Sequence, residues 1–235
     1  MARMERKQSS TGIYHIMMRG NEKKDIFIDD QDKYKFLKVF KEKTIQTNTI
    51  IYSYCLMKNH VHIVLKESEY GVSDFLKRIC VSYAYYFNRR YRRVGHLFQD
   101  RFKSEAIEDD RYLLTVIRYV HNNPVKAKIV HKADEYKWSS VSEYIGENTF
   151  VNIEDIFSSI HKDKALAKKE FIRFSKDAKD DYIMDYDEED TAQIKKTRDE
   201  NIRKMYIDNK MKKKDIAMQT GVSSKTIQRV LKSGQ

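Results

Sequence analysis

The sequence predicts an α+β domain, in which helices cover one face of an antiparallel sheet, followed by a small all-α domain. Short runs rich in β-branched and aromatic residues are interspersed with helical patterns over the first 130 residues. Two of these runs are separated only by the turn around Lys58-Asn59. Such a pair breaks the regular strand-helix alternation of a doubly wound parallel sheet and favours an antiparallel one. A compact basic stretch near the C-terminus predicts the second domain.

The elements follow in a definite order. We expect strands at residues 12–18, 50–57, 61–65 and 102–107. A helical stripe predicts a first helix over residues 29–46, and Ser73 is a candidate N-cap for a second helix that runs to about residue 91. A third helix opens at Asp109-Asp110 and should end just before Pro124. The order strand, helix, strand, strand, helix, strand, helix is similar to a ferredoxin-like unit.

The rest of the chain divides by charge. Residues 153–178 are again helical in pattern, and residues 179–190 are dominated by aspartate and glutamate. Residues 197–210 and 212–232 form the basic module. We therefore expect three parts: a first domain over 1–147, a helical extension with an acidic linker over 148–194, and a DNA-binding domain over 195–235.

Composition excludes several classes of protein. Forty percent of the 235 residues are apolar, which is enough for a core and excludes wholesale disorder. The longest uncharged stretch, residues 44–57, is too short and too polar to span a membrane. No apolar run follows the basic N-terminus as a signal peptide requires, and Cys55 and Cys80 offer no disulfide framework. We expect a cytoplasmic protein, associated with the nucleoid.

The positive charge suggests a polyanionic partner. The formal net charge is +11, with about +8 on residues 1–150, −5 on residues 151–194 and +8 on residues 195–235. Two basic blocks could each meet phosphates and release condensed counterions. Nucleic acid is the leading partner, and a lysine-rich solubilising surface is the alternative.

The motif His60-Val61-His62 is the strongest local signal. Residues two apart on a strand project from the same face, so the two imidazoles lie side by side and can bind one metal ion. Further along, Tyr119 and Asn123 are four residues apart on one helical face. A tyrosine can attack phosphorus if the phosphate is polarised, and a metal ion held by two histidines and an amide oxygen would polarise it. Nitrogen and oxygen ligands favour Mg²⁺ or Mn²⁺, without excluding zinc.

The same residues have a plainer interpretation. Histidines on strands are more often structural than ligands, and a helical tyrosine above a sheet is usually a core residue. Spacing alone leaves Tyr83, Tyr85, Tyr86 and Tyr112 as competing nucleophiles.

Five ordered blocks resemble the single-tyrosine HUH transposases, and within them the REP-associated tyrosine transposase branch. They cover roughly residues 10–146. The blocks are Tyr14-His15-Ile16 with Arg19-Gly20-Asn21, Met57-Lys58-Asn59-His60-Val61-His62, Phe87-Asn88-Arg89-Arg90-Tyr91, Gly95-His96-Leu97-Phe98-Gln99 with Arg101-Phe102-Lys103-Ser104, and Tyr119-Val120-His121-Asn122-Asn123-Pro124-Val125-Lys126-Ala127.

The resemblance implies a relaxase-like fold and a nuclease that cuts single-stranded DNA, usually beside a hairpin, through a 5′-phosphotyrosine. His60 and His62 would be metal ligands, Tyr119 the nucleophile and Asn123 the third ligand. Some related branches have glutamine in place of Asn123, and many relatives have glycine in place of Asp100. The protein would be a monomer or a homodimer, since some relatives exchange helices.

Two basic segments are candidate DNA contacts. Within residues 1–150, basic residues flank aromatic ones, as in grooves that hold single-stranded nucleic acid. The candidate contacts there are Arg89, Arg90, Arg92, Arg93, Arg101 and Lys103. Near the C-terminus, residues 214–231 resemble a helix-turn-helix whose second helix would enter the major groove of double-stranded DNA. Its candidate contacts are Ser224, Lys225, Gln228 and Arg229. The alternative is a three-helix bundle that docks on the first domain.

We therefore expect a metal-dependent endonuclease and strand transferase that acts on single-stranded or hairpin DNA. One alternative is a non-catalytic DNA-binding regulator derived from a transposase. Another is an RNA-binding protein, which the sheet topology allows, although no aromatic RNP-like motif is present.

Overall fold

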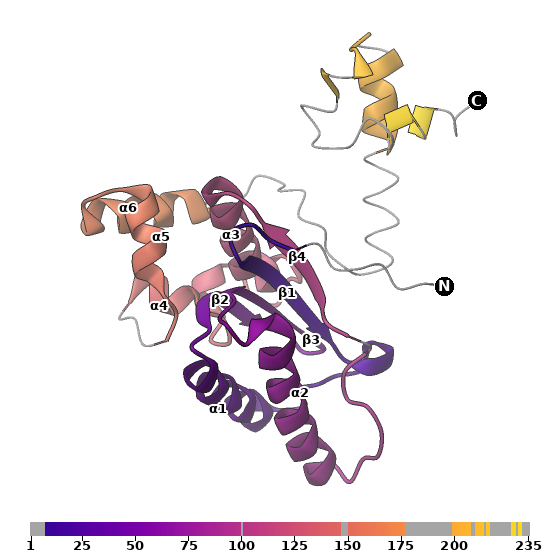
Figure 1. The fold of residues 1–235 in the computed structure, drawn as a ribbon, viewed down its shortest axis with the longest axis vertical. Helices are drawn as coiled ribbons and strands as arrows, with labels where there is room; N and C mark the ends of the chain where they lie inside the picture. The colour runs from indigo at the N-terminus through magenta and orange to yellow at the C-terminus, as the bar shows by residue number, and fades with distance from the viewer. Residues whose placement is uncertain are drawn as a thin grey trace. The chain divides into compact units, whose positions relative to one another are not determined.

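The computed structural model describes residues 8–99, 101–146, 150–176, 199–207, 210–213, 215–216, 227–228 and 230–231. The chain divides into two compact units, Met1–Asp181 and Tyr182–Gln235. None of the helices in the described residues is long and apolar enough to cross a bilayer. The first unit (Figure 1) contains the elements β1 (Ile13–Arg19), η1 (Asn21–Lys23), α1 (Asp30–Thr47), β2 (Ile50–Leu56), β3 (His60–Lys66), α2 (Gly71–Arg90), β4 (Lys103–Ile107), α3 (Asp110–Lys126), η2 (Ala133–Glu135), α4 (Val141–Ile145), α5 (Ile153–Ile160) and α6 (Lys164–Lys176).

The four strands form one antiparallel sheet in the order β2-β3-β1-β4. The predicted turn between the second and third strands is present, and the Met57 amide donates to the His60 carbonyl across it at 2.9 Å. Gly20 follows β1 where no side chain fits, because an added Cβ would lie 2.0 Å from the Lys24 carbonyl oxygen. The predicted α+β fold with an antiparallel sheet is confirmed.

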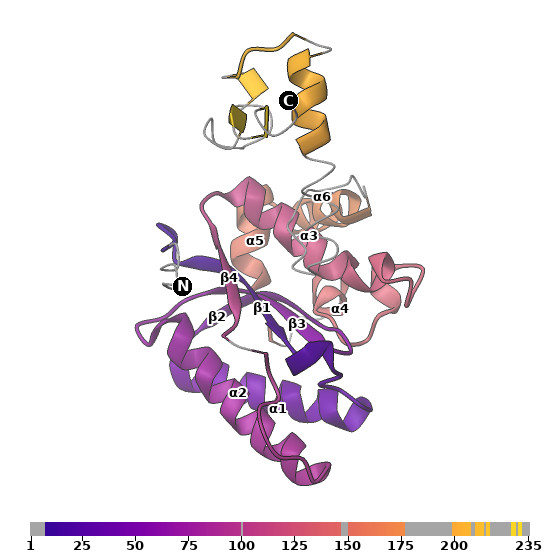
Figure 2. The same cartoon turned by 90° about the vertical axis from the view of Figure 1, so that its right-hand side faces the viewer.

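Helices pack on both faces of this sheet (Figure 2). Helices α1 and α2 cover the face that carries Met18 and Tyr54: Cys80 of α2 contacts Met18, and Phe40 of α1 contacts Tyr54. Helix α3 packs against the opposite face, where its Tyr119 contacts the ring of His62. The expectation of helices on one face thus describes α1 and α2, whereas α3 adds a layer that leaves the histidines between it and the sheet.

Two predicted helix ends are wrong. Helix α2 begins at Gly71, after Tyr70, so Ser73 lies inside the helix and is not its N-cap. Helix α3 begins after Asp109 as expected, with the Asp109 carboxylate accepting from the Tyr112 amide, but it continues through Pro124 to Lys126. A proline this close to a C-terminus removes one backbone hydrogen bond from the last turns only, and the helix tolerates the loss.

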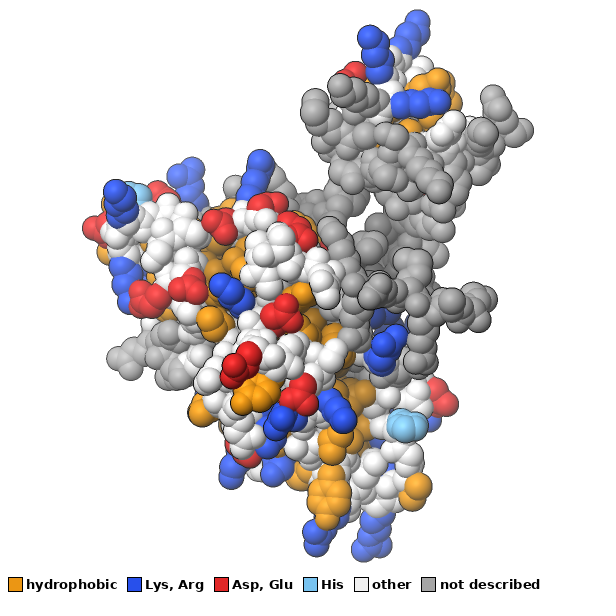
Figure 3. Space-filling view, viewed as in Figure 1, with side chains coloured by type: hydrophobic (Ala, Val, Ile, Leu, Met, Phe, Trp, Pro, Cys, Tyr) orange, Lys and Arg blue, Asp and Glu red, His pale blue; other side chains and the backbone are white. Residues whose placement is uncertain are grey.

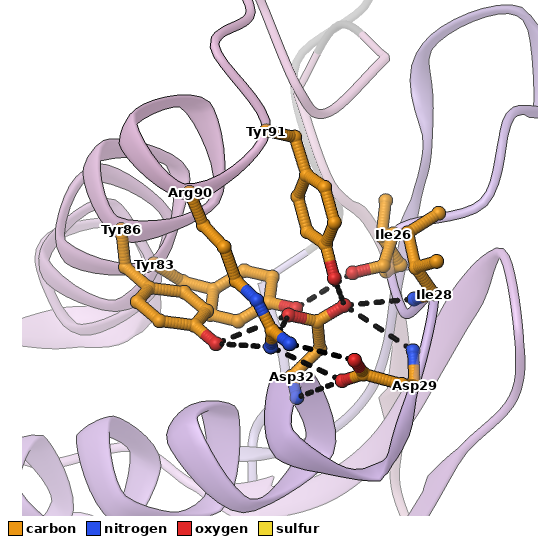
Figure 4. A network of polar contacts seen from close by, with 8 residues as sticks. All are labelled: Ile26, Ile28, Asp29, Asp32, Tyr83, Tyr86, Arg90 and Tyr91. Carbon is orange, nitrogen blue, oxygen red and sulfur yellow. Dashed lines mark hydrogen bonds and ion pairs between the residues drawn. The ribbon is translucent and has the colours of Figure 1, made fainter.

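A buried carboxylate joins the start of α1 to the end of α2 (Figure 4). The side chain of Asp32 is fully buried and accepts hydrogen bonds from the hydroxyls of Tyr86 and Tyr91 at 3.1 and 2.8 Å. It also accepts from the Ile28 amide at 2.8 Å and from the Arg90 guanidinium at 2.9 Å. Because several donors satisfy its oxygens, the charge is tolerated in the interior and fixes where the two helix ends meet.

The second unit has a small apolar core of its own. Among its described residues, Ile202, Ile216, Ile227 and Val230 are buried against one another. Residues 199–207 are helical, and Gln228 is exposed next to the buried Ile227. The other predicted DNA contacts of this module, Ser224, Lys225 and Arg229, lie outside the described residues, as does Asp100. The three-part domain division and the helix-turn-helix therefore stay predictions.

Candidate metal and nucleophile site

The two histidines of the motif lie on the same face of β3, as the strand period predicts. Their ring centroids are 4.9 Å apart and the rings meet edge to face at 85°. His62 is fully buried, whereas His60, next to the turn, is half-buried. One imidazole is thus enclosed by the protein and the other reaches the surface. A metal ion that binds both the protein and DNA would have to lie on that surface side.

Both imidazoles use Nδ1 within the protein. Nδ1 of His60 lies 2.7 Å from Oδ1 of Asn59, and the Asn59 amide nitrogen is already committed to the Lys23 carbonyl at 3.0 Å. The Asn59 oxygen must therefore accept, so His60 carries its proton on Nδ1. Nδ1 of His62 lies 3.1 Å from Nε2 of His15, a buried residue of β1.

The free nitrogen of His62 fits a metal ligand. Its Nε2 is buried and has no hydrogen-bond partner in the described part of the chain. Burial lowers the pKa of His62 well below its ordinary value, and the neighbouring His60 and His15 lower it further. The ring is therefore neutral at physiological pH, and a neutral imidazole is the form that ligates metals.

Tyr119 approaches this pair from α3. Its ring meets the ring of His62 edge-on at a centroid distance of 5.7 Å and that of His15 at 5.9 Å. The ammonium of Lys126, two turns further along α3, lies 4.6 Å from the Tyr119 ring centroid. Only 2% of the Tyr119 surface is exposed. The structure thus places the predicted nucleophile against the motif in the interior of the unit.

Asn123 is buried one turn after Tyr119, and its amide nitrogen donates to the Tyr119 carbonyl at 3.0 Å. In the described residues this hydrogen bond stays within α3 and reaches neither histidine. Those residues also contain no group of three or more His, Cys, Asp or Glu side chains that could hold a metal ion. Two imidazoles therefore fit a metal only if oxygen atoms complete its coordination, from the Asn123 amide or from DNA.

The four competing tyrosines have other environments. Tyr83 is fully buried and donates to the Ile26 carbonyl at 2.6 Å, and Tyr86 donates to Asp32. Tyr85 is largely exposed on α2, on the face of the sheet opposite to the histidines. Tyr112 donates to the Glu105 carboxylate at 2.7 Å. It is the strongest of the four competitors for the role of nucleophile, because Glu105 faces His15 beside the motif.

The predicted DNA contacts of the first unit differ in how exposed they are. Arg89, Arg92, Arg101 and Lys103 are exposed. Lys and Arg side chains gather over the C-terminal end of α2 (Figure 3). Arg93 is half-buried over the ring of Phe87, and the guanidinium of Arg90 is bound by Asp29 at 2.6 Å and Asp32 at 2.9 Å. Arg90 therefore has a structural partner that the sequence did not suggest, whereas a role in DNA binding stays a prediction for all six.

A cavity of about 350 Å³ lies on the other face of the sheet, at the start of α2, and is lined by Tyr14, Glu67 and Ser104 among others. It includes none of the residues of the motif and contributes nothing to this site.

Sequence reasoning missed three residues: Asn59, His15 and Glu105. His15 and Asn59 stand in the quoted blocks but had no assigned role, and Glu105 was not singled out. The signal for Asn59 was its position directly before His60. His15 and Glu105 are 47 and 43 residues from His62, so only the strand register brings them together.

Comparison with known families gives a match within the first unit. The profile of the family described as "Transposase IS200 like" matches residues 8–123. This part of the chain is thus similar to the IS200-like transposases. The matched region includes both motif histidines, Tyr119 and Asn123. A search of curated protein sequences finds no match to the chain.

One solved structure has the same fold, and a second is a weaker match. A REP-associated tyrosine transposase bound to a REP hairpin superimposes with a TM-score of 0.53 at 17% identity, over 63% of this chain and 87% of that one. A protein from Deinococcus radiodurans R1, provisionally assigned as a transposase, matches with a TM-score of 0.36 at 14% identity, over 52% of this chain and 97% of that one. The first match supports the predicted transposase fold.

Proposed function

We propose that the protein is a transposase of the REP-associated type that cleaves and rejoins single-stranded, hairpin-flanked DNA with a divalent metal ion. In this proposal His60, His62 and Asn123 hold Mg²⁺ or Mn²⁺, and Tyr119 is the nucleophile. The single observation that carries it is the contact of the Tyr119 ring with His62, whose Nε2 is buried without a hydrogen-bond partner among the described residues. The solved transposase of similar fold was bound to a hairpin, which supports the choice of substrate.

Each residue has a defined part in this chemistry. The Tyr119 oxygen forms a bond to phosphorus as the bond to the 3′ oxygen breaks, giving a 5′-phosphotyrosine. The phenol loses its proton and the leaving 3′ oxygen takes one up, so the reaction needs no nucleotide cofactor. A bound metal ion would polarise the phosphate as a Lewis acid. Asn59 holds His60 in one tautomer, and Lys126 adds positive charge near the ring that the phosphate must approach.

The burial of Tyr119 sets a condition on this proposal. At 2% exposure the ring cannot reach a DNA phosphate without movement of α3 or rotation of the side chain. DNA binding must therefore expose it. This burial is also the observation that favours the alternative, a non-catalytic DNA-binding regulator, in which Tyr119 is only a core residue.

Trapping the covalent adduct separates the two functions. We expect wild-type protein, incubated with single-stranded DNA that carries a hairpin and with Mn²⁺, to give a protein-DNA band that survives denaturation. Tyr119→Phe should abolish the band, since the attacking oxygen is gone, whereas Tyr85→Phe, which alters a largely exposed side chain on α2, should keep it. Chelation of the metal should also abolish it.

Two results would refute the assignment: a band that persists in Tyr119→Phe, or no band from wild-type protein that binds the same DNA normally. The second is the result that the regulator predicts.

A further inference from the structure

Three polar side chains form a line across the sheet beneath α3. His62 on β3, His15 on β1 and Glu105 on β4 project from the same face of the sheet. Glu105 lies directly opposite His15 on one side, and His62 lies diagonally across from His15 on the other. His62 Nδ1 is 3.1 Å from His15 Nε2, and His15 Nδ1 is 3.8 Å from a Glu105 oxygen. Both histidines are fully buried.

With both rings neutral, the contact between the two imidazoles allows two arrangements of protons, since one ring must donate and the other accept. In the first, His62 Nδ1–H donates to His15, and His15 carries its own proton on Nδ1, facing Glu105. In the second, His15 Nε2–H donates to His62, so His62 carries its proton on Nε2 and His15 turns a bare lone pair toward Glu105.

The carboxylate distinguishes these arrangements. His15 Nδ1 and the facing Glu105 oxygen are both buried, and neither has a hydrogen-bond partner among the described residues. At 3.8 Å the pair is held by charge and dipole, which favours an N–H toward the carboxylate and disfavours a lone pair. The second arrangement would also bury the His62 Nε2–H without an acceptor, at a cost of about 1–3 kcal/mol.

The charge on Glu105 is itself maintained by its neighbours. Burial raises the pKa of Glu105, but the contacts with His15 and with the Tyr112 hydroxyl outweigh burial and leave the pKa below its ordinary value. The Tyr112 hydroxyl donates to the other carboxylate oxygen at 2.7 Å and so fixes its orientation.

We propose that Glu105, through His15, is a positioning residue that holds His62 in the Nδ1–H tautomer and so points the lone pair of Nε2 at the ligand site. The proposal builds on the proposed function, since that function gives His62 its ligand. Outer-shell carboxylates that orient a histidine ligand in this way typically change metal affinity 10- to 100-fold when they are replaced.

The first test reads the tautomer of metal-free, full-length protein. Long-range ¹H–¹⁵N correlation spectra of ¹⁵N-histidine-labelled protein distinguish protonated from bare ring nitrogens. We expect His62 with a proton on Nδ1 only. In Glu105→Gln a neutral amide can turn either its oxygen or its NH₂ toward His15, so both tautomers of His62 should appear. A proton on Nε2 of wild-type His62 would overturn the proposal.

The second test measures Mn²⁺ binding to the metal-free protein by electron paramagnetic resonance. Glu105→Gln should weaken binding about 10-fold. Glu108→Gln is the matched control, because it removes the same charge three residues further along the chain, where the Glu108 carboxylate accepts hydrogen bonds from Ser10. If the two variants bind Mn²⁺ equally well, and His62 keeps one tautomer in both, the positioning role of Glu105 is wrong.

The two proposals fail in different ways. If wild-type protein binds no Mn²⁺ while Glu105→Gln still releases the second tautomer, the positioning role stands and the metal-dependent function falls. If Mn²⁺ binds and the adduct forms but Glu105→Gln changes neither tautomer nor affinity, the function stands and the positioning role falls. Thermal unfolding of each variant shows that it is folded before either result is read.

Discussion

At the scale of single residues, burial decides which nucleophilic and ligating groups are chemically active. His62 stays neutral because it is enclosed, and the His15 contact at Nδ1 leaves Nε2 as the nitrogen that could bind a ligand. Burial also favours the neutral form of a cysteine, but the consequence is the opposite: the neutral thiol is unreactive, because the thiolate is the nucleophile. Both cysteines are free, and the Cys80 sulfur lies 3.5 Å from that of Met18 beneath α2.

The reactivity of Cys80 gives a prediction about pH. Burial raises the pKa of its thiol to about 12. Below that value the thiolate fraction grows tenfold for each pH unit, so the rate of iodoacetamide alkylation should still rise tenfold per unit from pH 7 to pH 10. A thiol with the usual pKa of about 8.5 would level off above pH 9. The measurement is made on Cys55→Ala, which leaves one thiol, with urea-unfolded protein as the reference.

A plateau in the native protein near pH 9 would show that Cys80 is open to solvent and that α2 does not pack on the sheet as described.

How far the sequence could predict the site follows from what each residue depends on. His60 and His62 share a face through the strand period alone, and Tyr119 could be chosen through the family resemblance. Glu105 could not be found, because its role depends on β1 lying between β3 and β4. Register and strand order arise from long-range packing, which no local pattern encodes.

At the scale of elements, the meeting of α1 and α2 depends on one buried charge. Asp32 lies in the first turn of α1, its side chain is fully buried, and the Arg90 side chain beside it is 31% exposed. Removing the Asp32 carboxylate leaves the Arg90 guanidinium and the other donors around it without their acceptor. We expect Asp32→Ala to lower the free energy of unfolding by about 2–3 kcal/mol, reduced from the cost for a fully buried pair because Arg90 reaches solvent.

Urea denaturation at neutral pH measures this effect. Asp74→Ala is the matched control, since Asp74 forms an exposed ion pair with Arg78 on the same helix and should cost less than about 1 kcal/mol. Equal losses in the two variants would mean that the Asp32 network does not hold the helices together.

The order and type of the elements were predictable, whereas their ends and layers were less so. Asp109 marks a helix start because a carboxylate can cap it, and Asn48 ends α1 in the left-handed region at φ 50°. The end of α3 was predicted too early, because a proline in the final turns of a helix does not terminate it. The packing of α3 on the opposite face of the sheet could not be predicted from the sequence pattern. An amphipathic pattern shows that one side of a helix is buried, but not which face of the sheet it packs against.

At the scale of the whole molecule, two units with separate cores imply separate stabilities. The second unit, Tyr182–Gln235, is far smaller than the first and relies on the core around Ile202 and Ile216. Small domains bury little apolar surface and are only marginally stable. One charged substitution in that core should therefore unfold the second unit without affecting the first.

The helix at residues 199–207 offers a matched pair of substitutions for this experiment. Ile202 is fully buried and Ile207 is 65% exposed. Ile202→Asp places an unpaired carboxylate in the small core and should unfold it, while Ile207→Asp adds the same charge in solvent and should not. If the second unit binds DNA, as the sequence predicts, Ile202→Asp should weaken binding to duplex DNA and flatten its salt dependence, because fewer phosphates are neutralised.

Covalent adduct formation should be retained in both variants at saturating DNA, since His60, His62 and Tyr119 belong to the first unit. Binding titrations at several salt concentrations and the denaturing-gel adduct assay measure the two properties independently. Loss of the adduct in Ile202→Asp with unchanged duplex affinity would reverse the assignment: the small unit would then serve the chemistry of the first, and the basic surface of the first unit would account for DNA binding.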